Sequence, residues 1–165
     1  MRNKKVLFLT QAAMIAALYV VLTFLANALG LASQAVQVRF SEALTILPYF
    51  TPAAIPGLFI GCLISNTLTG CLPLDILFGS LATLIGALGT YFLRKFKWAA
   101  PLPPIIANTI IVPFVLIYVY QAGPLASLPF FALTVGLGEI ISCGILGMLL
   151  LFALAKYRKQ LFPVD

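Results

Sequence analysis

The sequence contains no histidine and very little charge: 8% of its 165 residues are charged, and only four of these are acidic. A soluble domain carries about a quarter charged residues. Without histidine, the commonest general base, no serine, cysteine or lysine stands in a motif that would activate it as a nucleophile. The sequence also lacks a metal-ligand cluster and a phosphate-binding glycine loop with lysine. This pattern argues against an enzyme, against a bound metal or cofactor, and against ATP hydrolysis by this chain.

Long apolar runs are what the sequence has instead, with 62% hydrophobic residues and a mean hydropathy of +1.12. Each run reaches or approaches the ~20 residues that cross a bilayer as a helix. The runs are Val6 to Leu29, Leu74 to Phe92, Pro104 to Tyr120 and Pro129 to Ala155. The sequence therefore predicts an all-α, multi-pass protein of the cell membrane, with the lipid bilayer as its surroundings.

The basic residues are clustered, and nine of the ten lie in three groups. These groups are Arg2, Lys4 and Lys5; Arg94, Lys95 and Lys97; and Lys156, Arg158 and Lys159. The positive-inside rule places all three in the cytoplasm. We therefore expect six transmembrane helical segments with both termini cytoplasmic, forming one integral-membrane domain over residues 1–165. Because the groups are spaced at helix ends, they do not indicate a nucleic-acid partner.

One expected segment is too short to cross the membrane in the usual way. Val38 to Phe50 would span only ~20 Å as a helix, less than the ~30 Å hydrocarbon core, so it is either a short helix shielded by its neighbours or a re-entrant element. The other expected helices are Lys5 to Leu29, Pro56 to Thr69, Asp75 to the second basic group, Pro104 to Tyr120 and Pro129 to Lys156.

Apart from the three groups and Asp165, four charged residues remain, and all lie in the outer half of the expected bundle: Arg39, Glu42, Asp75 and Glu139. A charge at membrane depth costs roughly 3 kcal/mol or more, which indicates a functional role. Arg39 and Glu42 are three residues apart, so they either form an ion pair on one helix face or border a pocket. Asp75 is placed to cap a helix N-terminus. Glu139 has no neighbour in sequence to neutralise it and is the strongest site candidate.

Four alanines in the first helix form two interleaved pairs with small-xxx-small spacing, a pattern that lets another helix approach closely. They are Ala12 with Ala16 and Ala13 with Ala17. Packing within the chain and docking on a partner helix are both open from the pattern alone.

Four stretches of the sequence together resemble the QueT family: Val36 to Phe50, Pro56 to Cys62, Phe78 to Leu84 and Val135 to Glu139. Members of that family are predicted queuosine-precursor transporters, the substrate-binding S components of energy-coupling factor (ECF) transporters. The resemblance implies a six-helix protein that captures its ligand from outside and docks on one ECF transmembrane subunit with two ATPase subunits. It also implies that the alanine pairs contact that transmembrane subunit, and that the ligand is a deazaguanine base.

A carboxylate accepts the adjacent N–H and amino groups of a guanine-type edge as a bidentate pair. An aminomethyl substituent would add a cation for a second carboxylate, and we predict Glu139 and Glu42 for these two roles. Arg39 and Asp75 belong to the same candidate site. Ring stacking would come from aromatic residues, and further polar contacts from two amides. The candidates for these contacts are Phe40, Tyr49, Tyr120 and Phe130, and Asn66 and Gln37.

Two other functions remain open from the sequence. An S component for another vitamin or purine-like compound would share the fold. A structural or channel-forming membrane protein would oligomerise through its glycine and alanine faces.

Overall fold

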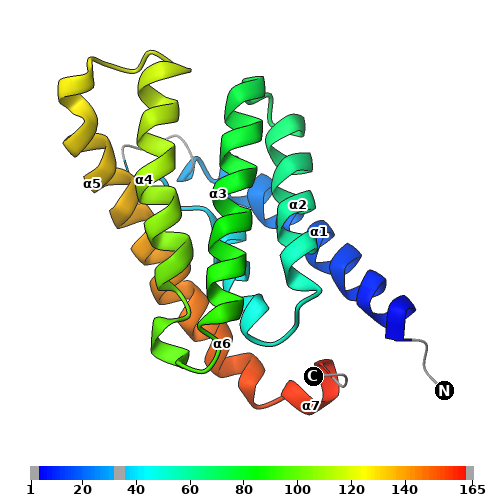
Figure 1. Cartoon of the computed structure of the whole chain (residues 1–165). Coiled ribbons are helices and arrows are strands. Elements are labelled where there is room, and N and C mark those ends of the chain that lie inside the picture. The colour runs from blue at the N-terminus through cyan, green and yellow to red at the C-terminus, as the bar shows by residue number, and fades with distance from the viewer. Residues whose placement is uncertain (1–3, 32–35, 163–165) are drawn as a thin grey trace.

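The structure is a computed structural model that describes residues 4–31 and 36–162, and the described residues form helices and connections without any strand (Figure 1). The elements are α1 (Lys4–Ala28), the 3-10 helix η2 (Phe40–Tyr49), α2 (Ala54–Leu68), α3 (Pro73–Phe92), α4 (Leu102–Tyr118), α5 (Leu128–Glu139), the π-helix η5 (Ile140–Leu146), α6 (Gly147–Ala155) and α7 (Arg158–Leu161). Short 3-10 turns occur at Lys97–Ala99 and Leu125–Ser127. The elements α5, η5 and α6 follow one another directly and form the predicted last long helix.

Four helical stretches are long and apolar enough to cross a membrane: Lys4–Ala28, Pro73–Phe92, Lys97–Tyr118 and Leu125–Ala155. The shorter apolar helix α2 and the 3-10 helix η2 complete the six expected segments. The all-helical prediction is thus confirmed. Six membrane crossings with cytoplasmic termini stay a prediction.

The three described segments that carry basic groups lie toward one end of the bundle, and Arg39 lies apart from them on the cavity walls. In Figure 1 the start of α1, the α3–α4 connection and α7 all lie toward the lower end, while the α2–α3 and α4–α5 connections lie at the upper end. We call the first of these the basic end. Arg2 and Asp165 lie outside the described residues.

Small residues bring neighbouring helices close together. A Cβ atom on Gly57 of α2 would come within 2.7 Å of the Ala12 carbonyl oxygen in α1, and one on Gly61 within 3.0 Å of the Ala16 Cα. On α3, a Cβ at Gly86 would lie 2.7 Å from the Pro104 Cα of α4. These contacts need glycine because the backbones themselves touch. The α1–α2 and α3–α4 pairs are fixed in this way.

The short segment η2 lies at the centre of the bundle and contacts α1, α2, α3, η5 and α6. Its side chains are almost fully buried, with Ile46 and Glu42 only 1% and 2% exposed. A ten-residue 3-10 helix rises about 20 Å, so it ends inside the protein. The segment is thus a short helix shielded by its neighbours, and whether it crosses or re-enters the bilayer stays a prediction. This element carries polar groups into the interior, where other helices supply their partners.

Candidate functional site

Two adjoining cavities lie inside the bundle, and residues of α3 and α4 line both. The first, which we call the acidic cavity, is about 30 Å³ and is lined by both Glu42 and Glu139. The second, the wide cavity, is about 390 Å³ and extends to Tyr120 at the end of α4. Four residues line both cavities and join them: Gln37, Arg39, Asp75 and Val112.

The acidic cavity holds two carboxylates that are remote in sequence. Glu42 comes from η2 and Glu139 from the end of α5, and they are 2% and 8% exposed. One oxygen of each lies with the Cys143 sulfur in a group whose atoms are all within 4.8 Å of one another. This spacing would suit a divalent cation, but the three side chains already belong to a connected hydrogen-bond cluster. We therefore treat them as a ligand-binding group.

Glu42 is held by donors from two other helices. The phenol of Tyr19 in α1 donates to its Oε1, and the amide of Asn108 in α4 donates to its Oε2 over 3.5 Å. Tyr19 is itself 1% exposed, so this contact is excluded from solvent. Both oxygens of Glu42 thus have a partner within the protein, and its position is fixed.

Glu139 has weaker partners. Its Oε2 accepts a hydrogen bond from the Cys143 thiol at 3.1 Å, and a thiol is a weak donor. The Asn108 side chain interacts with it as well as with Glu42. Glu139 therefore keeps acceptor capacity for a ligand. This agrees with the sequence analysis, in which Glu139 is the strongest candidate for the binding site.

The π-helical turn after Glu139 connects it to η2. Ser142 Oγ accepts the backbone N–H of Arg39 at 3.1 Å, and Cys143 Sγ lies 3.4 Å from the Glu42 carbonyl oxygen. A π-turn is rare and often lies at a functional site. Here the turn brings two consecutive side chains onto the segment that carries Arg39 and Glu42.

Arg39 borders the pocket and does not form the alternative helical ion pair. It precedes η2 as the N-cap in an extended conformation (φ −112°, ψ 111°), so it shares no helix face with Glu42. Within the described residues, its guanidinium forms no ion pair with a carboxylate. The positive charge lines both cavities and is available to a ligand.

Asp75 lines both cavities, and its hydrogen-bond partner comes from the segment after α4. Its Oδ2 accepts a hydrogen bond of 2.7 Å from Tyr120, whose hydroxyl also accepts the Leu72 amide at 3.3 Å. Burial and the hydrogen bond to Asp75 raise the pKa of Tyr120, so the phenol stays protonated at neutral pH and donates. Asp75 lies in the first turn of α3, as predicted, but the described structure shows no side-chain cap hydrogen bond for this helix, so the predicted cap is not formed. Pro73 and Leu72 begin the helix, and the carboxylate turns to the cavities instead.

Other predicted residues divide between the site and the rest of the fold. Gln37 lines both cavities, and Asn66 and Tyr120 line the wide one. Three predicted aromatics, Phe40, Tyr49 and Phe130, line neither cavity. Tyr49 packs against the core beside Phe50, and Phe130 is 58% exposed.

The alanine stripe of α1 has two faces. Ala12 and Ala16 are both 8% exposed and pack on α2, whereas Ala13 and Ala17 are exposed. Packing within the chain thus accounts for the first pair. Docking on another subunit stays a prediction, and it would use the second pair.

Sequence reasoning missed Tyr19 and Asn108. Asn108 is a single amide inside the apolar helix α4, and that isolation is the signal that could have marked it. Tyr19 gave no such signal, because a tyrosine in a membrane helix is common and its partner is 23 residues away.

Comparison with known proteins supplies the family. A protein-family model described as QueT transporter matches residues 9–156. The chain belongs to the QueT transporter family. The curated queuosine precursor transporter QueT of Lactococcus lactis subsp. cremoris (strain MG1363) is 34% identical over 98 residues, which are 59% of this chain and 57% of that protein. The match thus spans little more than half of that relative's length. No solved structure matches the chain significantly.

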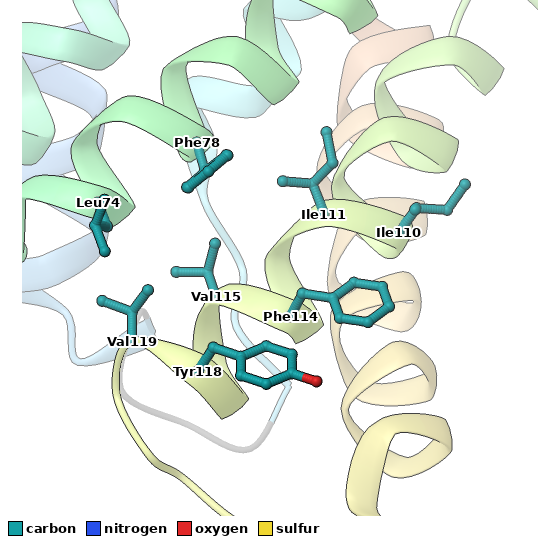
Figure 2. A pocket seen from close by; sticks show the side chains of 8 residues that line it. All are labelled: Leu74, Phe78, Ile110, Ile111, Phe114, Val115, Tyr118 and Val119. Carbon is teal, nitrogen blue, oxygen red and sulfur yellow. The ribbon is translucent and has the colours of Figure 1, made fainter. Parts of the chain in front are cut away.

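Membership in the QueT transporter family, with several long apolar helices, makes this a multi-pass protein of the cell membrane. A third hollow of about 430 Å³ lies on the outside of the bundle between α3 and α4 (Figure 2). Its labelled side chains are apolar except for the Tyr118 hydroxyl, and Ile110 and Tyr118 are 57% and 65% exposed. This groove suits lipid chains, so the two polar cavities remain the candidate site for a polar ligand.

Proposed function

We propose that this QueT family member is the substrate-capture subunit of an ECF-type importer and binds deazaguanine bases that are precursors of queuosine. The observation that carries this proposal is the state of Glu139, a buried carboxylate at a cavity wall whose partners are a thiol and a shared amide. The family and the name of the Lactococcus relative point to the same ligand class.

The hydrogen-bonding groups of a deazaguanine base match the residues that line the acidic cavity. Its ring N–H and adjacent amino group are two parallel donors, and Glu139 accepts both as a charge-assisted pair. The carbonyl next to the ring N–H needs a donor, which Asn108 or Arg39 supplies. Val112 and Val135 offer apolar contact to the flat ring.

The cavity volumes indicate how the base is placed. Ligand pockets commonly measure about 300–1,000 Å³, which the wide cavity reaches and the acidic cavity does not. The ring therefore lies mainly in the wide cavity, and its donor edge extends past the shared residues to Glu139.

Uptake against a gradient needs an energy source that the chain lacks, because its sequence has no phosphate-binding loop. We assign that role to an ECF module of one transmembrane subunit and two ATPase subunits. The exposed alanines Ala13 and Ala17 are the contact we assign to the transmembrane subunit.

Calorimetric titration of the purified protein in detergent tests the ligand assignment. Deazaguanine bases should bind, and the Glu139→Gln variant should lose about 2 kcal/mol of binding free energy, more than tenfold in affinity. Thr134→Val is the matched control, since it removes a buried hydroxyl on the same helix that bonds only the Phe131 carbonyl.

Two results would contradict the proposal. If the parent protein binds no deazaguanine but binds another vitamin, the ligand class is wrong. If Glu139→Gln binds as tightly as the parent, Glu139 is not the recognition residue. Copurification with an ECF ATPase module tests the transport class separately, because a structural or channel protein would not retain it.

A further inference from the structure

The two cavities carry more negative than positive charge. Three carboxylates, of Glu42, Glu139 and Asp75, line them together, and Arg39 is the one cationic side chain on their walls in the described chain. When all are ionised the excess is two negative charges. With one proton shared by the two glutamates, one negative charge still remains. A neutral ligand leaves this charge uncompensated inside the protein, whereas a cationic ligand neutralises it.

The carboxylates line the two cavities differently. Glu42 and Glu139 are adjacent and line the acidic cavity, whereas Asp75 lines both cavities and is the one carboxylate among the described residues on the wall of the wide one. Both oxygens of Glu42 already accept hydrogen bonds, from Tyr19 and Asn108, whereas Asp75 accepts one described hydrogen bond, from Tyr120. Asp75 therefore replaces Glu42 in our assignment of the ligand cation.

Asp75 is suited to bind a cation. Tyr120 occupies its Oδ2, and the Tyr120 hydroxyl is fixed in turn by the Leu72 amide. The carboxylate is thus oriented, and in the described residues its Oδ1 accepts no hydrogen bond. Within the described residues Asp75 makes no salt bridge, and the charge that acts on it is that of Arg39 on the same cavity walls, so a ligand ammonium group would be its direct counter-ion.

We infer that Asp75 forms a subsite for a primary amine on the ligand, so that the base bound at Glu139 is one that carries an aminoalkyl substituent. This inference rests on the proposed function. On a deazaguanine ring, the substituent on the five-membered ring lies on the side opposite the amino group that Glu139 accepts. A base bound by that edge therefore directs its substituent toward the part of the wide cavity that Asp75 lines. A nitrile at the same position brings no positive charge and gains nothing from the aspartate.

Calorimetric titration with two substituted deazaguanine bases tests the amine subsite. One base carries an aminomethyl group on the five-membered ring, and the other carries a nitrile at the same position. The wild-type protein should bind the aminomethyl base about tenfold or more tightly. Asp75→Asn should remove this preference by weakening the aminomethyl base alone, and its unchanged affinity for the nitrile base shows that it is folded. Tyr120→Phe, which keeps the charge and removes its hydrogen bond, should retain the preference.

The outcomes separate the two proposals. Equal affinity of the wild-type protein for both bases overturns the amine subsite and leaves the proposed function standing, and this comparison needs no variant. An Asp75→Asn variant that weakens both bases equally also overturns it. Binding of neither base by the wild-type protein overturns the proposed function and this inference with it.

Discussion

The phenol of Tyr19, on the first helix, donates a hydrogen bond to the carboxylate of Glu42 in the central 3-10 helix. One turn further along α1, Thr23 Oγ1 donates to Ser41 Oγ at 2.9 Å. The first helix is thus tied to the site segment by two consecutive side-chain contacts. A movement of α1 would be transmitted directly to a carboxylate of the acidic cavity.

Replacing Tyr19 with phenylalanine removes one of these contacts and leaves a buried carboxylate oxygen without its donor. We expect a loss of about 1–3 kcal/mol in stability and about a tenfold loss of ligand affinity. Thermal unfolding and titration calorimetry in detergent measure the two effects. Tyr49→Phe is the matched control, because the Tyr49 hydroxyl makes no hydrogen bond within the described chain. Equal behaviour of the two variants would exclude a role for the Tyr19 hydroxyl.

The two alanine pairs of α1 should respond differently to enlargement. Leucine at Ala12 and Ala16 would collide with Gly57 and Gly61 of α2, so we expect a loss of folded protein.

Leucine at Ala13 and Ala17 adds bulk to an exposed face. Ligand binding by the isolated subunit should survive, while ATP-driven uptake in vesicles containing the ECF module should fall at least about tenfold if this face docks. Ala153→Leu, an exposed alanine on α6, controls for bulk alone. Undiminished uptake by the Ala13 and Ala17 variant would remove this face from the docking surface.

Glycine 138 should tolerate no side chain. A Cβ there would overlap the carbonyl oxygen of Gln37, which belongs to the segment that lines both cavities. Gly138→Ala should therefore cost about 1–3 kcal/mol in stability and weaken binding by displacing that segment. At Gly144 a Cβ would meet only Ile140 and Ile105 side chains at 3.7 and 3.8 Å, so Gly144→Ala should unfold at the parent temperature. If both variants match the parent, Gln37 moves at no cost and its backbone does not shape the site.

Much of the fold follows from local signals in the sequence. Apolar length, with prolines such as Pro56 near a helix start, predicts the helices to within a few residues. The isolation of Glu139 in an apolar run marks it without any structure. What the sequence could not predict depends on contacts between distant residues. The hydrogen bond from Asn108 to Glu42 joins residues 66 apart, and a charge pattern does not show which neutral side chain will contact a carboxylate.

The local backbone conformation was the second feature that the sequence could not predict. The three-residue spacing of Arg39 and Glu42 predicts a shared face only if both belong to a regular helix, and Arg39 lies before η2 in an extended conformation. Likewise, the π-turn that places Ser142 and Cys143 against η2 is stabilised by those tertiary contacts, not by local propensity.

The amide of Asn108 interacts with both glutamates, so its replacement by an isosteric acid should be severe. Asn108→Asp exchanges a donor for a third carboxylate beside Glu42 and Glu139, and like charges in a buried site repel. We expect ligand affinity to fall more than about tenfold and thermal stability to fall as well. The control Asn66→Asp makes the same change at an equally buried residue, whose amide contacts the Cys62 sulfur and which lines the wide cavity. Its effect should be smaller, because water in the wide cavity solvates the added charge. If Asn66→Asp is the more damaging variant, the close glutamate pair is not the centre of the site.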